Sequence, residues 1–204
     1  PQTLEAQAEA ELLMEVQRHI RSPRFGGPII GCEQDHVSGC FLLTKRGQEF
    51  AREEAFQLLC EIGMRPGIDF ELPKKRKISG KELFSMLIPK NINLEFRAKS
   101  CVGCEKCLKE KCPYDAYVVI RNGKLECGVI DAKAIGKEKG FLLHAIERYC
   151  GAEEAHRFLD RVSQLGIRFL DKRGFTCGLD DYDIPENALA EVRKYVEKTK
   201  QNVN

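Results

Sequence analysis

The sequence predicts a mixed α+β fold, with short strands and loops in the first two thirds of the chain and helices in the last third. Two apolar runs flank Asn122-Gly123, a dipeptide that suits a type I′ hairpin turn because both central residues adopt positive φ. An apolar stripe recurs at helical spacing between Glu153 and Lys172. Four of the ten cysteines fall within residues 101–112, as expected for a small metal-binding insertion.

The first 90 residues are expected to form helices separated by loops. Thr3 is in position to cap a first helix that continues to about Arg21, because apolar residues recur at helical spacing: Leu12, Val16 and Ile20. Residues 28–31 and 40–43 are expected to be short extended pieces. A helix is expected over residues 52–62, with an apolar face made of Ala55, Phe56, Leu59 and Cys60. The capping box Ser79-Gly80-Lys81-Glu82 predicts a short helix that ends at Pro89.

The later part of the chain is expected to hold a strand, a hairpin and several helices. The strand at 93–96 leads into the cysteines, and the hairpin spans residues 114–130. Helical segments follow in order: 131–136, 140–150, 153–172 and a last helix from Pro185. We therefore expect two domains, a loop-rich α+β domain over 1–139 with the cysteine-rich insertion at 101–112, and a helical segment over 140–204.

The composition is that of a globular protein, with 43% hydrophobic and 31% charged residues among 204. The longest unbroken apolar run spans about five residues, 116–120, far short of the roughly 20 that a membrane helix needs. The first residues lack the basic and then apolar pattern of a signal peptide. A cytoplasmic location is the resulting expectation.

The cysteine segment has the spacing of a metal site. Cys101 and Cys104 form a C-x2-C pair, and Cys107 and Cys112 form a looser second pair. Four thiolates can close a tetrahedral zinc site, which is structural because no position stays open for water. An iron–sulfur cluster is the rival, but ferredoxin segments place the last cysteine after three residues and this chain after four. Structural zinc is favoured, and iron–sulfur or no metal stay open.

The remaining candidate residues are interpreted as structural. The other six cysteines are expected to pack as small apolar residues. Cys32, His36 and Cys40 are expected in a loop that would not hold them on one face. His144 and His156 have no evident partner, and the acidic run from Asp180 to Asp183 is expected to be a solvated turn and helix start.

Charge alone does not predict nucleic-acid binding. The formal net charge is +2, from 33 basic and 31 acidic residues, whereas phosphate affinity depends on clustered Lys and Arg. The single dense cluster, Lys74-Lys75-Arg76-Lys77, is interpreted as a solvated loop, with a phosphate contact as the alternative.

Several stretches resemble, in the same order, the largest subunit of multisubunit RNA polymerases. Pro1-Gln2-Thr3-Leu4-Glu5 resembles the segment after the family's Asn-Ala-Asp-Phe-Asp-Gly-Asp loop, and residues 79–90 are similar to its pore-domain helix. Further similar stretches are Ser22-Pro23, Gln34-Asp35 with Gly39, Asn122-Gly123 through Asp131, Ile135-Gly136, and Gly174 through Asp181. The cysteine cluster before Tyr114-Asp115 makes the chain most similar to the archaeal A′ type.

The resemblance implies DNA-directed RNA polymerase activity, a nucleotidyl transfer supported by two metal ions, in an assembled complex. This chain would correspond to the pore and the start of the funnel, where NTPs enter and backtracked RNA leaves. The aspartates that hold the catalytic Mg²⁺ would lie upstream of Pro1, so the expected role is architectural, without a catalytic residue in this chain. The implied partners are other polymerase subunits, DNA, RNA and NTPs, and no residue is assigned to nucleic-acid binding.

Two other functions stay open from the residues alone. One is a small zinc-stabilised nucleic-acid-binding module, which would bind phosphates through its basic loop. The other is an iron–sulfur electron carrier, which would be coloured and redox-active.

Overall fold

The computed structural model describes residues 2–101 and 107–203. The chain forms two compact units, Pro1–Arg173 and Gly174–Asn204. Helices and short strands are both present, which confirms the mixed α+β class. None of the described helices combines the length and the apolar character needed to cross a membrane.

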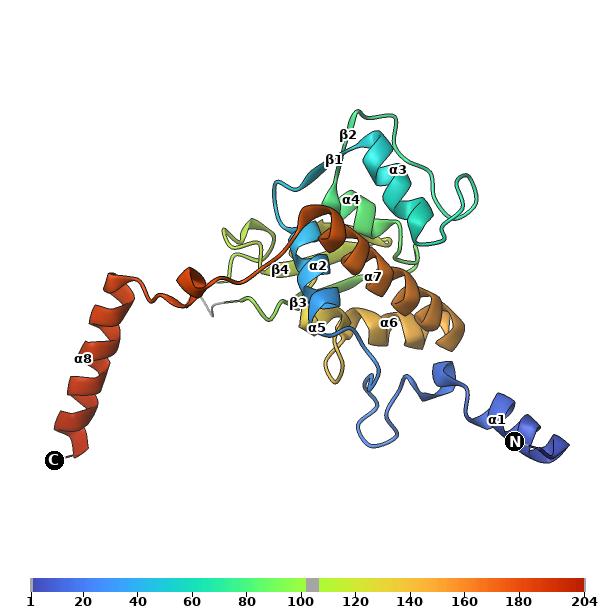
Figure 1. Cartoon of the computed structure of the whole chain (residues 1–204), viewed down its shortest axis with the longest axis horizontal. Coiled ribbons are helices and arrows are strands. Elements are labelled where there is room, and N and C mark those ends of the chain that lie inside the picture. The colour runs from blue at the N-terminus through green and yellow to red at the C-terminus, as the bar shows by residue number, and fades with distance from the viewer. Residues whose placement is uncertain (1, 102–106, 204) are drawn as a thin grey trace. The chain divides into compact units, whose positions relative to one another are not determined.

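Two helices form the centre of the first unit. Helix α2 (Asp35–Thr44) runs along helix α7 (Ala152–Arg173), as Figure 1 shows. The backbones approach closely, because a Cβ added at Gly39 would lie 2.2 Å from the carbonyl oxygen of Gly166. Helices α4 (Gly80–Ser85) and α6 (Phe141–Cys150) complete this core, to which α7 contributes the predicted stripe, including buried Phe158, Val162 and Leu165.

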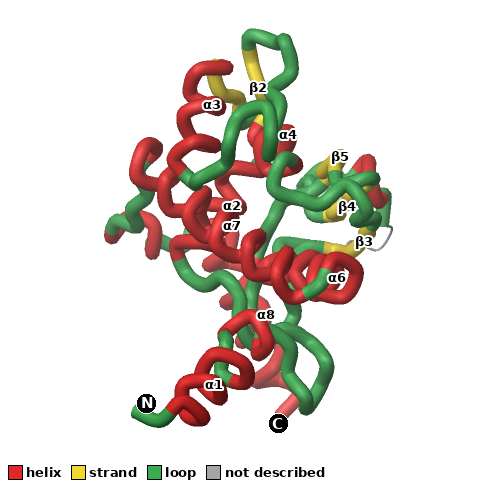
Figure 2. The backbone as a smooth tube through the Cα atoms, turned by 90° about the vertical axis from the view of Figure 1, so that its right-hand side faces the viewer, coloured by secondary structure: helices red, strands yellow, loops and turns green. Residues whose placement is uncertain are grey.

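Two small antiparallel sheets accompany these helices. Strands β1 (Glu49–Ala51) and β2 (Lys77–Ser79) pair with each other, and the second sheet has the order β3-β4-β5: Leu94–Arg97, Tyr117–Arg121 and Lys124–Cys127. The hairpin prediction is confirmed, since Asn122 and Gly123 have φ of 50° and 72° between β4 and β5. Figure 2 shows the β3-β4-β5 sheet to one side of α2 and α7.

The other helical segments of the first unit include α1 and α3. Their bounds are α1 Leu4–Leu13, η1 Val16–His19, α3 Arg52–Glu61, η2 Lys109–Lys111 and α5 Ala132–Ile135. The predicted caps are confirmed at Thr3, which accepts from the Ala6 backbone N–H at 3.2 Å, and at Ser79, which forms a reciprocal capping box with Glu82. Asp131 caps α5 through the Lys133 backbone N–H.

Three expectations about local structure were wrong. Residues 40–43 are not extended but lie in α2, where packing against α7 stabilises the helix. The first helix ends at Leu13 rather than near Arg21, and only η1 follows it. The buried face of α3 differs from the predicted one, because Leu58 is buried whereas Phe56 and Cys60 are exposed.

The second unit consists of η3 (Leu179–Tyr182) and helix α8 (Glu186–Val203). Asp181 accepts a hydrogen bond from the Gly178 backbone N–H at 2.7 Å, so the acidic run starts a short helical turn, as expected. Val192 and Val196 of the predicted stripe are 53% and 48% exposed. The compact units divide after Arg173; the expected boundary between two types of domain at 139 and 140 stays a prediction.

Candidate functional site

The cysteine segment begins where strand β3 ends. The Ala98 backbone N–H donates to the Ala116 carbonyl at 2.9 Å, which extends the β3–β4 pairing by one more bond, and the Cys101 N–H then turns back to the Ala98 carbonyl at 3.3 Å. The short helix η2 comes before Cys112, whose N–H bonds to the Lys109 carbonyl at 3.0 Å. The sheet therefore fixes where the segment leaves and rejoins the fold.

Three of the four predicted ligands border one small cavity of about 90 Å³. Cys101, Cys107 and Cys112 line it together with Arg97, Leu108, Pro113, Ala116 and Tyr117. Cys104, the fourth predicted ligand, lies outside the described residues. Within residues 2–101 and 107–203, no three His, Cys, Asp or Glu residues form a group that could hold a metal ion. The donor set still fits a thiolate-binding metal, since three cysteines from a twelve-residue stretch border one cavity.

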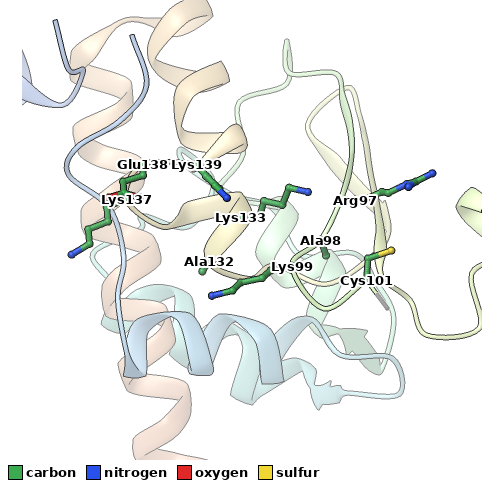
Figure 3. Close-up of a pocket in the computed structure, with 9 residues that line it drawn as sticks. All are labelled: Arg97, Ala98, Lys99, Cys101, Ala132, Lys133, Lys137, Glu138 and Lys139. Atoms are coloured by element: carbon green, nitrogen blue, oxygen red, sulfur yellow. The ribbon is translucent and has the colours of Figure 1, made fainter. Parts of the chain in front are cut away.

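A second and larger cavity, of about 530 Å³, lies beside the cysteine segment (Figure 3). It is bordered by Arg97, Ala98, Lys99, Cys101, Ala132, Lys133, Lys137, Glu138 and Lys139. Basic side chains outnumber acidic ones by five to one in that set, so the cavity, here called the basic cavity, attracts anions. Arg97 and Cys101 border both cavities.

Hydrogen bonds to Asp131 join the two segments that form the basic cavity. Its carboxylate accepts from the backbone N–H groups of Lys99 at 2.5 Å and Ser100 at 3.2 Å, while it also caps α5. In Figure 3, Arg97 and Lys137 extend in opposite directions, whereas Lys133 lies between them. Lys137 pairs with Glu33, and this hydrogen bond raises the pKa of the Lys137 ammonium. Part of the positive charge is thus already compensated.

Sequence reasoning missed the basic cavity. Its basic residues come from residues 97–99 and 133–139, which are separated by the cysteine segment and the hairpin. The cluster that was singled out, Lys74 to Lys77, is exposed, and two of its members pair with carboxylates. Lys75 lies 3.1 Å from Glu82, and Lys77 lies 2.9 Å from Glu49, whose hydrogen bond raises the Lys77 pKa.

Cys32, His36 and Cys40 contribute to packing, as expected, but the structure places His36 and Cys40 in a helix rather than in the expected loop. His36 and Cys40 lie one turn apart on α2, not in a loop, and both face α7. His36 Nδ1 is 3.2 Å from the Ser163 carbonyl oxygen, and the Cys40 thiol donates to the Val162 carbonyl at 3.6 Å. Burial raises the pKa of Cys32 to about 12 and that of Cys40 well above its usual value. Both thiols therefore stay protonated at neutral pH.

Comparison with known proteins gives a consistent result. The family described as "RNA polymerase Rpb1, domain 3" matches residues 19–182. DNA-directed RNA polymerase subunit Rpo1N of Methanocaldococcus jannaschii is 46% identical over 210 residues, and that of Methanococcus vannielii is 44% identical over 206. Both alignments cover 100% of this chain but only 15% and 23% of the relatives. DNA-directed RNA polymerase III subunit rpc1 of Schizosaccharomyces pombe is 33% identical over 89% of this chain and 14% of its own length.

Proposed function

Because the chain belongs to the family of RNA polymerase largest subunits, as a fragment of the archaeal type, we propose that it contributes to DNA-templated RNA synthesis by shaping the pore and the start of the funnel. NTPs would reach the active centre of the assembled polymerase through this passage, and backtracked RNA would leave by it. The fragment's own role is architectural rather than catalytic. Its partners are the other polymerase subunits, DNA, RNA and NTPs, in the cytoplasm.

The basic cavity is the observation that carries this proposal. A passage for NTPs and RNA has to accept polyanions, and surface cavities lined by one sign of charge raise the local concentration of the opposite sign. Lys99, Lys133 and Lys139 supply such charge from two separate segments. Glu138 and the pairing of Lys137 with Glu33 moderate it, which suits passage better than tight retention.

The test uses the full-length largest subunit that contains this segment, assembled with its partner subunits. Replacing Lys99 and Lys139 together by Ala should raise the KM for NTPs by about two- to tenfold, because weaker attraction slows the arrival of charged ligands. Lys77→Ala, which removes a charge already paired with Glu49, is the matched control. An unchanged KM together with unchanged backtracking in the double variant would contradict the proposal.

The chain alone supplies a second test of the architectural role. With template, NTPs and Mg²⁺, the purified chain is expected to make no RNA. Template-dependent synthesis by this chain would contradict the view that it acts only within the complex. Sub-micromolar DNA binding at physiological salt would instead favour the nucleic-acid-binding module.

We also propose that Cys101, Cys104, Cys107 and Cys112 hold one structural zinc ion. The shared cavity of Cys101, Cys107 and Cys112 supports this, and a zinc ion would cross-link the two ends of the segment. Elemental analysis of the purified, untagged chain should find about one zinc per chain, without colour. Iron with sulfide and visible absorption would identify a cluster instead.

A further inference from the structure

One buried carboxylate, that of Asp115, lies where three parts of the fold meet the cysteine segment. The Lys81 ammonium on α4 lies 2.5 Å from Asp115 Oδ2, and the two side chains are 17% and 8% exposed. The Gly128 backbone N–H, just after β5, donates to Oδ1 at 2.9 Å. Arg46, between α2 and β1, reaches to within 3.7 Å of Oδ1. A helix, a hairpin and a loop are therefore joined at this carboxylate.

The same group of residues holds the backbone of Cys112. The Asp115 backbone N–H donates to the Cys112 carbonyl oxygen at 3.1 Å, and the Arg46 guanidinium donates to that oxygen at 3.4 Å. Asp115 has φ of 52°, a left-handed conformation that closes the turn after Cys112. Arg46 thus touches both the carboxylate and the carbonyl, and both contacts restrain the last predicted metal ligand.

We propose that Asp115 is a positioning residue for the metal site, acting on Cys112 through Arg46 and through the turn of residues 112–115. The inference rests on the proposed four-cysteine site. A ligand that is already held in place loses less conformational freedom when the metal binds, so the affinity for the metal is higher. Lys81 orients the Asp115 carboxylate from the core side through their ion pair, so Asp115 is held by the folded core rather than by the cysteine segment.

The test measures zinc affinity of the full chain by competition with a chelator of known affinity. Asp115→Asn is the informative variant, because Asn keeps the size, tolerates positive φ and can still accept from Gly128, while the charge that orients Arg46 is lost. Substitution of residues that orient metal ligands typically lowers the affinity for the metal by about 10- to 100-fold. The zinc dissociation constant of Asp115→Asn should therefore rise by about tenfold or more. The stoichiometry should stay at one zinc per chain.

Two controls separate positioning from general destabilisation. Glu126→Gln removes a carboxylate that pairs with Arg121 at 2.9 Å on the exposed side of the same hairpin, and it should leave the zinc affinity unchanged. Thr44→Val removes buried hydrogen bonds to Cys40 and Ile130, which are not among the predicted ligands, and it should lower stability without weakening zinc binding. Equal loss of affinity in Thr44→Val and Asp115→Asn would overturn the inference, since the effect would then follow stability alone.

The outcomes also distinguish this inference from the zinc proposal. If the unaltered chain holds no metal, the four-cysteine site is wrong. If it holds zinc and Asp115→Asn binds zinc equally well, only the positioning role is wrong. Should Asp115→Asn fail to fold, Arg46→Met decides, because Arg46 is 62% exposed and its loss spares the core. That variant should weaken zinc binding about two- to tenfold, as expected for one hydrogen bond, and an unchanged affinity would overturn the inference.

Discussion

The hydroxyl of Thr44 joins the last turn of helix α2 to the backbone of Ile130. It donates to the Cys40 carbonyl at 2.8 Å and accepts from the Ile130 backbone N–H at 2.9 Å. Thr44 and Ile130 are both fully buried. One hydroxyl therefore satisfies a backbone donor that lies 86 residues away along the chain, between the hairpin and α5.

Thr44→Val should lower the free energy of unfolding by about 1–3 kcal/mol, because the Ile130 N–H would be left buried without an acceptor. Urea unfolding followed by circular dichroism measures the change. Thr44→Ser keeps the hydroxyl and is the matched control, with a smaller loss from the missing methyl group. Equal stability of Thr44→Val and the unaltered chain would show that water or a shifted backbone replaces the bond.

Gly39→Ala should destabilise the first unit by about 1–3 kcal/mol through overpacking. The added methyl carbon would lie 2.2 Å from the Gly166 carbonyl oxygen, so α2 and α7 would have to move apart. Gly178→Ala is a suitable control, since its nearest neighbour is 3.9 Å away and belongs to a side chain. Thermal unfolding compares the two, and an unchanged midpoint for Gly39→Ala would mean that the helices are farther apart than described.

The capping box at α4 predicts a pH dependence. The pKa of Glu82 lies below its usual value, mainly because its carboxylate accepts a hydrogen bond from the Ser79 backbone N–H. Hydrogen bonds from Lys75 and from the Ser79 hydroxyl lower it further. A lowered folded-state pKa adds stability that is present above the unfolded-state pKa, about 4.3, and is lost as the pH falls through the lowered value. Glu82→Gln should thus be less stable than the unaltered chain at pH 7, and the difference should vanish in acid. A difference that persists at pH 2 would assign the effect to hydrogen bonding rather than to charge.

Removal of the proposed metal ion should loosen the β3–β4 end of the sheet. Cys107→Ser is expected to abolish stoichiometric zinc and to speed hydrogen exchange in residues 97–117, because the segment would lose its cross-link. Cys177→Ser, at an exposed cysteine of the second unit, is the control and should change neither quantity. Exchange that is equally slow in Cys107→Ser would mean that protein contacts alone order this segment.

Local signals predicted most of the elements, and contacts between distant segments account for the misses. Asn122-Gly123 and Ser79 with Glu82 encode their turn and cap within four residues, so both could be read directly. Residues 40–43 are a short apolar run after Gly39, and no cap or periodic pattern nearby marks them as a helix. The need for glycine at position 39 is explained only by the close approach of the Gly166 backbone.

The candidate sites divide in the same way. The cysteine spacing is a local pattern and indicated a metal site, whereas the basic cavity exists only once the hairpin and α5 bring residues 133–139 beside residues 97–99. The network at Asp115 was equally hidden, because Arg46, Lys81 and Gly128 are dispersed over 83 residues of sequence. Sequence spacing can predict metal ligands that are close in sequence. It cannot predict clusters of charged residues that are distant in sequence and come together only in the folded structure.

Arg97 and Cys101 belong to the walls of both cavities, so binding in one cavity would be coupled to binding in the other wherever it moves this common wall. Whatever displaces Cys101, whether a bound ion or an oxidised sulfur, also reshapes the space offered to an anion next to it. Thermodynamic linkage then requires equal effects in both directions. If an ion bound by the thiols changes the affinity of the basic cavity for an anion, the anion changes the affinity of the thiols for that ion by the same factor. Metal binding by these thiols and anion binding in the basic cavity would then strengthen or weaken each other equally.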